Sequence, residues 1–233
     1  TMRSGHRMVE IETWVNNASE DHRLRLHVPM GCQTKTVHAG GAFDIIERPI
    51  HWPHMSDWEQ PHVPTHHFSD VLITQEKDGG VALFCPGSNE YEGFNGDDGT
   101  SVAITLLRAT GHLSRDGFAS RRNRAGPVFE APGAQCKGTH WTRWAVMAFT
   151  DDWAEAGIHQ VAETYACKAG IISALPKPQL DGEYDEACTP GTRGRHLQPI
   201  RLVGTGPTPI VACVKPAADG NGTVVRLYNP TNE

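Results

Sequence analysis

The sequence predicts an all-β protein, built as an antiparallel β-sandwich with few short helices. Short runs rich in β-branched and aromatic residues recur along the chain. Turn-forming residues bound most of these runs, and the chain contains 24 glycines and 16 prolines. Helical periodicity sustained over ten residues is scarce. The chain therefore lacks the regular alternation of strands and helices that builds a parallel sheet.

The first two predicted strands alternate apolar and polar residues. In residues 9–15, valine, isoleucine and threonine alternate with glutamate and tryptophan, and in residues 24–28 leucine and valine alternate with arginine and histidine. This period of two is typical of strands whose two faces meet different environments. Because residues 16–19 read Asn-Asn-Ala-Ser, a turn sequence, we expect the two strands to form a hairpin.

Later strands are predicted where short apolar runs lie between turn residues. They are residues 43–47, 70–74, 81–85, 102–108, 141–149, 200–203, 210–214 and 224–228. The best helical candidate spans residues 151–165, where Gly157 interrupts the apolar periodicity.

Residues 175–195 carry proline, glycine and charge with little apolar periodicity, which is typical of either a linker or a long loop. We therefore expect a main β-sandwich domain over residues 1–197. Residues 198–233 would add C-terminal strands that start a second β unit. The opening Thr1-Met2 and the end at Asn232-Glu233 suggest a piece excised from a longer protein.

Charge and hydropathy exclude several classes of partner. The net charge of -6 argues against nucleic acid, whose binding relies on a basic face. No run approaches the roughly 20 apolar residues of a membrane span, and no charged segment followed by an apolar run indicates a signal peptide. The six cysteines form no C-x-x-C pair, which argues against structural zinc. Free thiols or, in an exported protein, three disulfides both remain open.

The most prominent candidate for metal binding is a histidine-rich segment. Its metal-ligand types are His51, His54, Asp57, Glu59, His62, His66 and His67. Their spacing matches no closed zinc site or H-E-x-x-H motif, and four prolines make the segment an extended loop, so we predict no metal site.

Trp52 and Trp58 lie in the same segment. They could stack on a sugar ring or anchor the loop on the sandwich, and both interpretations stay open. Adjacent carboxylates such as Asp97-Asp98 and Asp151-Asp152 lie in turn-like settings typical of solvated surface. The sequence therefore indicates no catalytic residue.

A series of motifs follows one another along the chain. They are DHRLR (residues 21–25), FDIIERP (43–49), GVALF (80–84), AITLLRATGHLSR (103–115), AGP (125–127), GAQCKG (133–138) and VVRLYNPT (224–231). Each motif alone is weak, but the ordered series resembles the C-terminal β region of bacterial family 38 glycoside hydrolases, the α-mannosidase and mannosylglycerate-hydrolase type.

The resemblance implies a supersandwich fold of the galactose-mutarotase type. It also implies that a zinc ion and an aspartate nucleophile belong to an N-terminal catalytic domain, followed by a helical bundle, both outside this chain. This chain would then need no cofactor of its own and would be a non-catalytic module. Its partners would be the catalytic and helical domains of the same polypeptide, a mannoside or related glycan, and in a homo-oligomer other copies. A bacterial cytoplasmic location follows.

Within that resemblance, Arg48 and Trp52 are the candidate substrate-binding residues. A strand-end ion pair of Arg48 with Glu47 or Asp44 is the simpler alternative. For the DHRLR motif we expect a polar strand face that grips a neighbouring module. The rival hypothesis for the whole chain is an autonomous carbohydrate-binding module. It would use Trp52, Trp58 and Trp141 as a stacking platform.

Overall fold

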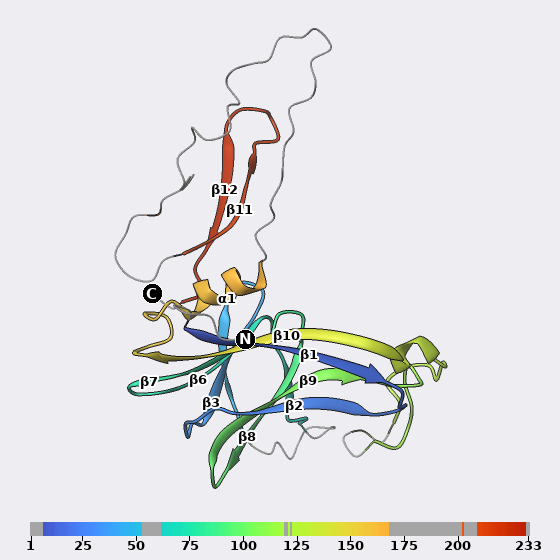
Figure 1. Cartoon of the computed structure of the whole chain (residues 1–233). Helices are drawn as coiled ribbons and strands as arrows, with labels where there is room; N and C mark the ends of the chain where they lie inside the picture. Colours follow the sequence, from blue (N-terminus) through green and yellow to red (C-terminus); the bar gives the residue numbers. More distant parts are fainter. Residues whose placement is uncertain are drawn as a thin grey trace, which may run out of the picture.

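The computed structural model describes residues 7–52, 62–118, 121, 123–167, 202 and 209–231. Within this part of the chain, two antiparallel sheets face each other (Figure 1). The six-stranded sheet consists, in spatial order, of β1 (Met8–Asn17), β10 (Gly138–Thr150), β7 (Gly79–Phe84), β6 (Val71–Glu76), β3 (Thr36–Gly40) and β4 (Ile45–Pro49). The four-stranded sheet consists of β2 (Arg23–Pro29), β9 (Gly99–Arg108), β8 (Glu90–Gly96) and β5 (Thr65–His67). The predicted all-β antiparallel sandwich is confirmed.

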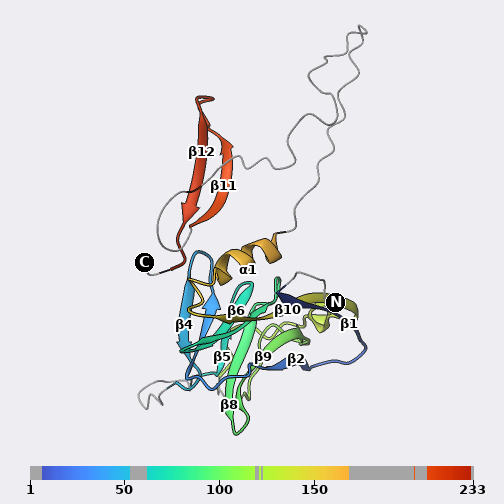
Figure 2. The same cartoon turned by 60° about the vertical axis from the view of Figure 1, so that its left-hand side comes forward.

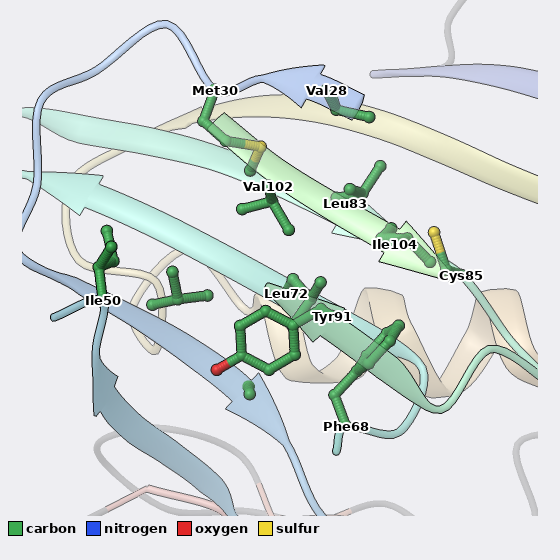
Figure 3. Close-up of a cluster of buried hydrophobic side chains, with 12 residues drawn as sticks. Val28, Met30, Ile50, Phe68, Leu72, Leu83, Cys85, Tyr91, Val102 and Ile104 are labelled. Atoms are coloured by element: carbon green, nitrogen blue, oxygen red, sulfur yellow. The ribbon is translucent and has the colours of Figure 1, made fainter. Parts of the chain in front are cut away.

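The main core lies between the two sheets. The large side chains Met30, Phe68, Leu72, Leu83 and Tyr91 are almost fully buried there (Figure 3). Phe68 meets Tyr91 edge to face, with ring centroids 5.7 Å apart, a favoured aromatic geometry. Burial of this apolar surface is the main force that holds the sheets together.

A second apolar cluster covers the outer face of the six-stranded sheet. Helix α1 (Ile158–Ala166) buries Ile158 and Ala162 against Phe84 and Met147 of the sheet. The helix expected over residues 151–165 is present only after Gly157, which is its N-cap residue and adopts φ +67°, a conformation that glycine reaches without strain. The helix therefore begins directly after it.

The expected hairpin between the first two strands is also wrong. β1 pairs with β10 along its whole length, whereas β2 pairs with β9 in the other sheet. The connection between them crosses from one sheet to the other. Asp21 adopts φ +48° in this connection. The alternation of apolar residues identified both strands correctly, but it does not say which strand each one pairs with.

Polar contacts fasten this crossing, at a place that we call the Asp21 junction (Asn17, Asp21, Gly111 and Gln135). The Gln135 Oε1 atom accepts a hydrogen bond from the Asp21 N–H at 2.9 Å, and the Asp21 carboxylate accepts from the Gly111 N–H at 2.9 Å and the Gln135 amide at 3.0 Å. The Asn17 amide donates to the Gln135 carbonyl at 2.9 Å. The junction thus joins residues from DHRLR, ATGHLSR and GAQCKG.

Most predicted strands are present, with differences at particular places. β3, β5 and β8 were not predicted, and the strand expected at residues 43–47 begins at Ile45, since Phe43 is exposed and precedes it. The candidate at residues 200–203, apart from Leu202, and the segment 175–195 lie outside the described residues. The division into residues 1–197 and 198–233 stays a prediction.

The last two strands, β11 (Ile210–Pro216) and β12 (Thr223–Tyr228), form a separate antiparallel pair. In both views this hairpin stands beyond α1, away from the sandwich (Figures 1 and 2). Its near end contacts the sandwich, because Tyr228 donates a hydrogen bond to the Glu163 carboxylate and packs edge to face on Phe43.

Candidate functional site

The candidate site lies where the edge strands of the two sheets meet. β4 is the edge of the six-stranded sheet, and β5 is the edge of the four-stranded sheet. Between them the chain turns inward at Ile50, whose N–H bonds to the Lys35 carbonyl at 2.9 Å. Ile50 is buried in the core against Gly93, where a Cβ would lie only 3.0 Å from Ile50 Cγ1. After Ile50 the chain leaves β4 of the first sheet, and Trp52 reaches β5 of the other sheet, where it bonds to His66.

Arg48 connects the two edge strands. From β4, its Nη1 donates to the His67 carbonyl of β5 at 2.7 Å, and its Nη2 lies 3.3 Å from His67 Nε2. Among the described residues Arg48 forms no ion pair with Glu47 or Asp44, so the geometry does not support that alternative. A guanidinium carries five N–H groups, and these contacts use two of them.

Trp52 packs on two histidines of the same segment. Its ring stacks on His62, with centroids 4.7 Å apart and planes 18° apart, and its Nε1 donates to His66 Nε2 at 3.1 Å. Its side chain remains 42% exposed. One face of the indole is therefore covered by an imidazole, which is the geometry expected of a residue that anchors the loop.

We call the resulting group the histidine cluster, and it connects the surface to the core. Its members are Arg48, Trp52, His62, His66, His67 and Tyr91. His66 and Tyr91 are register partners on β5 and β8, and their rings lie 5.7 Å apart. Two residues that sequence reasoning selected, Arg48 and Trp52, are thus brought together. Sequence reasoning missed Tyr91, whose buried ring lies next to that of His66.

Burial and charge shift the titration of this cluster. Burial lowers the pKa of His66, and the charge of Arg48 lowers it further. Burial raises the pKa of Tyr91, while the adjacent Arg48 opposes this shift. The Tyr91 hydroxyl is shielded from solvent and has no hydrogen-bond partner of ordinary geometry among the described residues. A neutral His66 suits its role as acceptor for the Trp52 N–H.

No group of three or more histidine, cysteine, aspartate or glutamate side chains that could hold a metal ion occurs within the described ranges. Three residues of the histidine-rich segment, His54, Asp57 and Glu59, lie outside those ranges. The absence of a metal site in this segment therefore stays a prediction. No helix in the described part is long and apolar enough to cross a membrane.

A pair of exposed tryptophans lies near the opposite edge of the six-stranded sheet, on β1 and β10. Trp14 of β1 and Trp141 of β10 are direct cross-strand partners, and their side chains are 62% and 47% exposed. Sequence reasoning missed Trp14. The available signal was its position on the polar side of the β1 alternation. Trp141 lies on β10, next to one edge of this sheet, whereas Trp52 follows β4 at the opposite edge. The two residues therefore do not form one stacking platform.

A cavity of about 620 Å³ lies near this tryptophan pair. β7 ends its pairing with β10 at Phe84, so beyond Ala145 the β10 edge on that side has no β7 partner. Residues 140–143 of that edge, residues 86–89 and the end of β9 line the cavity. Its lining combines hydroxyl and aliphatic side chains with the charged residues Glu90, Arg108 and Arg143, a mixture suited to a polar ligand.

The outer face of the four-stranded sheet is held by ion pairs within the sheet. Arg25 pairs with Glu92, and Arg23 lies 3.2 Å from Glu90. Arg108 adds a contact to Glu90 at 3.5 Å. The arginines of DHRLR, which we expected to grip another module, thus have partners on β8.

Together the two sheets, their shared core and the covering helix define the chain as an antiparallel β-sandwich domain. The family model described as "Glycosyl hydrolases family 38 C-terminal domain" matches residues 1–114. In these residues the chain is thus similar to the C-terminal domain of family 38 glycosyl hydrolases.

The proteins that resemble this chain over most of its length are much longer than it is. Over 233 residues, the whole chain, it is 25% identical to a putative mannosylglycerate hydrolase from Halalkalibacterium halodurans, of which it spans 22%. A solved glycosyl hydrolase family 38 protein from Enterococcus faecalis superimposes with a TM-score of 0.55 and 26% identity, covering 71% of this chain and 17% of that one. An α-mannosidase from Enterococcus faecalis V583 gives a TM-score of 0.55 and 28% identity, covering 69% and 16%.

Proposed function

We propose that this chain is the non-catalytic C-terminal β-sandwich module of a retaining, α-mannosidase-type glycosidase. The observation that carries the proposal is the match of the whole chain to about a fifth of a relative named as a putative mannosylglycerate hydrolase. In this proposal the zinc ion and the aspartate nucleophile belong to the catalytic domain of the longer polypeptide. The module packs on that domain and closes one wall of the substrate cleft, where it excludes water.

The histidine cluster is the part of the module that would face the sugar. Arg48 is half-buried and is oriented by the His67 carbonyl, which lowers the entropy lost when it binds a ligand. Its remaining N–H groups suit sugar hydroxyls or a site carboxylate. Trp52 bonds to His66, the neighbour of His67 on β5, and part of its indole is exposed. Both residues are proposed as substrate-binding, and neither as catalytic.

The decisive test is activity of this chain by itself. We expect the purified chain not to hydrolyse p-nitrophenyl α-mannoside, with or without added zinc, while the full-length polypeptide does. Turnover by the isolated chain that a substitution within it abolishes would overturn the proposal. That substitution also excludes a contaminating hydrolase as the source of activity.

A second candidate function, an autonomous carbohydrate-binding module, is supported by the exposed Trp14–Trp141 pair near the cavity. Aromatic faces stack on sugar rings, and the indole N–H donates to hydroxyls. Glycan-array binding by the isolated chain that is lost in a Trp14→Ala/Trp141→Ala variant would favour this function. A docking role of the same pair predicts no glycan binding.

Compartment and assembly belong to the same proposal. All five described cysteines are free thiols, which fits a reducing bacterial cytoplasm. A homo-oligomer of the full-length polypeptide is proposed on the resemblance alone, and analytical ultracentrifugation of that polypeptide would test it.

A further inference from the structure

Tyr91 of β8 carries a hydroxyl that packing alone does not explain. The residue is 2% exposed, and its hydroxyl has no hydrogen-bond partner of ordinary geometry in the described part of the chain. Its ring packs edge to face on Phe68 and lies beside the ring of His66, contacts that a phenylalanine would also make. Burial of an unpaired hydroxyl is destabilising, so this group calls for a role other than packing.

The Tyr91 hydroxyl points toward the end of β4. In Figure 3 it is directed away from Phe68, to the side on which Ile50 lies. Ile50 packs against Gly93, which is two residues beyond Tyr91 and therefore on the same face of β8. Arg48 precedes Ile50 by two residues on the chain. Burial raises the pKa of Tyr91, whereas the nearby Arg48 guanidinium lowers it, so Arg48 is a polar neighbour of this hydroxyl.

Arg48 itself is held by a single residue, His67, through its carbonyl at 2.7 Å and its ring Nε2 at 3.3 Å. Among the described residues Arg48 has no carboxylate partner, whereas both arginines of β2 pair with glutamates. A guanidinium is a planar fork of five N–H groups, so a second fixed acceptor would define where its remaining donors point. Tyr91 is placed to supply this acceptor, because its register partner His66 is the neighbour of His67 on β5.

We propose that Tyr91 is a positioning residue for Arg48: its buried hydroxyl oxygen accepts a hydrogen bond from the guanidinium and directs the remaining N–H groups toward the substrate. The inference rests on the proposed function, in which Arg48 binds substrate. The hydrogen bond forms when substrate engages Arg48, since hydrogen bonds in active sites often tighten only in the complex. Because the hydroxyl lies in the core, Tyr91 acts through Arg48 and does not itself touch the substrate.

Stability of the isolated chain separates this role from a contribution to the fold. Tyr91→Phe removes only the hydroxyl. Tyr165→Phe is the matched control, because Tyr165 also lies beside an arginine, Arg143, but outside the histidine cluster. We expect neither variant to lower the urea concentration at the midpoint of unfolding. A midpoint lowered by Tyr91→Phe alone would give its hydroxyl a structural role and overturn the inference.

In the full-length polypeptide Tyr91→Phe should weaken substrate binding. We expect it to raise KM for p-nitrophenyl α-mannoside about three- to tenfold and to leave kcat nearly unchanged, the pattern of a lost binding interaction. Tyr165→Phe should change neither constant. Because Tyr91 acts through Arg48, the Arg48→Ala/Tyr91→Phe variant should have the same kcat/KM as Arg48→Ala alone. A merely structural hydroxyl would instead add its loss to that of Arg48→Ala.

Three kinetic results would overturn the inference. Wild-type constants in Tyr91→Phe, together with impaired Arg48→Ala, would remove the role of Tyr91 and leave the proposed function standing. Additive losses in the double variant would show that Tyr91 does not act through Arg48. Wild-type constants in Arg48→Ala would reject the substrate-binding role of Arg48, and the role of Tyr91 with it.

Discussion

The histidine cluster and the Asp21 junction both join the two sheets through polar side chains, but they use their hydrogen-bonding capacity differently. At the junction the Asp21 carboxylate accepts two hydrogen bonds, and the Gln135 amide both donates and accepts. In the cluster, Arg48 has donors beyond those the described contacts use, and the buried Tyr91 hydroxyl has no partner of ordinary geometry among the described residues. A saturated junction is typical of a structural role, whereas spare donors on a preorganised side chain are what a ligand site needs.

The largest expected effect comes from Arg48→Ala in the full-length enzyme. Loss of a charged hydrogen-bond donor should lower kcat/KM by one to two orders of magnitude, about 1.5 to 3 kcal/mol, and leave the fold of the β module largely intact. Steady-state kinetics with a mannoside and circular dichroism check this. Arg124→Ala is the matched control, because Arg124 is an exposed arginine outside both the histidine cluster and the cavity. Unchanged kinetics in Arg48→Ala would reject the substrate-binding role and leave Arg48 a structural residue that contacts His67.

At the junction the expected effect is on stability. Gln135→Ala removes the acceptor for the Asp21 N–H and a donor to its carboxylate, in a place where Gln135 is buried. The free energy of unfolding of the isolated chain should fall by about 1 to 3 kcal/mol, measured by urea denaturation. Lys137→Ala, an exposed neighbour, should change it by only about 0.5 kcal/mol or less. Equal effects of the two variants would contradict the structural role of the junction.

A smaller effect concerns pH. Burial is the first cause that lowers the pKa values of both His66 and His38 from 6.5. The unfolded chain therefore binds protons near pH 6.5 that the folded chain takes up only at lower pH. Stability contributed by the neutral imidazoles is present above pH 6.5 and is lost as the pH falls below it. Burial raises the pKa of Asp70, which acts in the opposite direction at more acidic pH.

Urea denaturation between pH 7.5 and 5.5 measures this dependence. We expect the free energy of unfolding to decrease across this range, and to decrease less in the His66→Gln and His38→Gln variants. A slope unchanged by both substitutions would show that other groups cause the pH dependence.

The last prediction concerns zinc, for which we expect no effect at all. We predict that the isolated chain binds no zinc ion. Its histidine-rich segment lacks the ligand spacing of a known zinc site. Elemental analysis of the purified chain should find no stoichiometric zinc. One tightly held zinc per chain, lost in a His66→Ala/His67→Ala variant, would contradict the prediction and give the histidine cluster a metal-binding role.

Strands with regular alternation could be predicted, because their periodicity is local. β1 and β10 are of this kind. β3 and β8 were missed because glycines dilute their patterns at points of close packing. A Cβ on Gly40 would lie 2.2 Å from the Ser69 carbonyl oxygen, and one on Gly93 would meet Ile50. These glycines are required by neighbours that are distant in sequence, and a local pattern does not report such neighbours.

The amino-acid sequence by itself determined the all-β class, most strand positions and the family resemblance, because alternation, turn residues and motif order are properties of short segments. It also singled out Arg48 and Trp52. Only the tertiary structure decided that β1 and β2 belong to different sheets and that Arg48 binds the His67 carbonyl. It likewise placed the ring of Tyr91 next to that of His66. Strand partners are chosen by packing and hydrogen bonding over long sequence separations, so no local pattern specifies them.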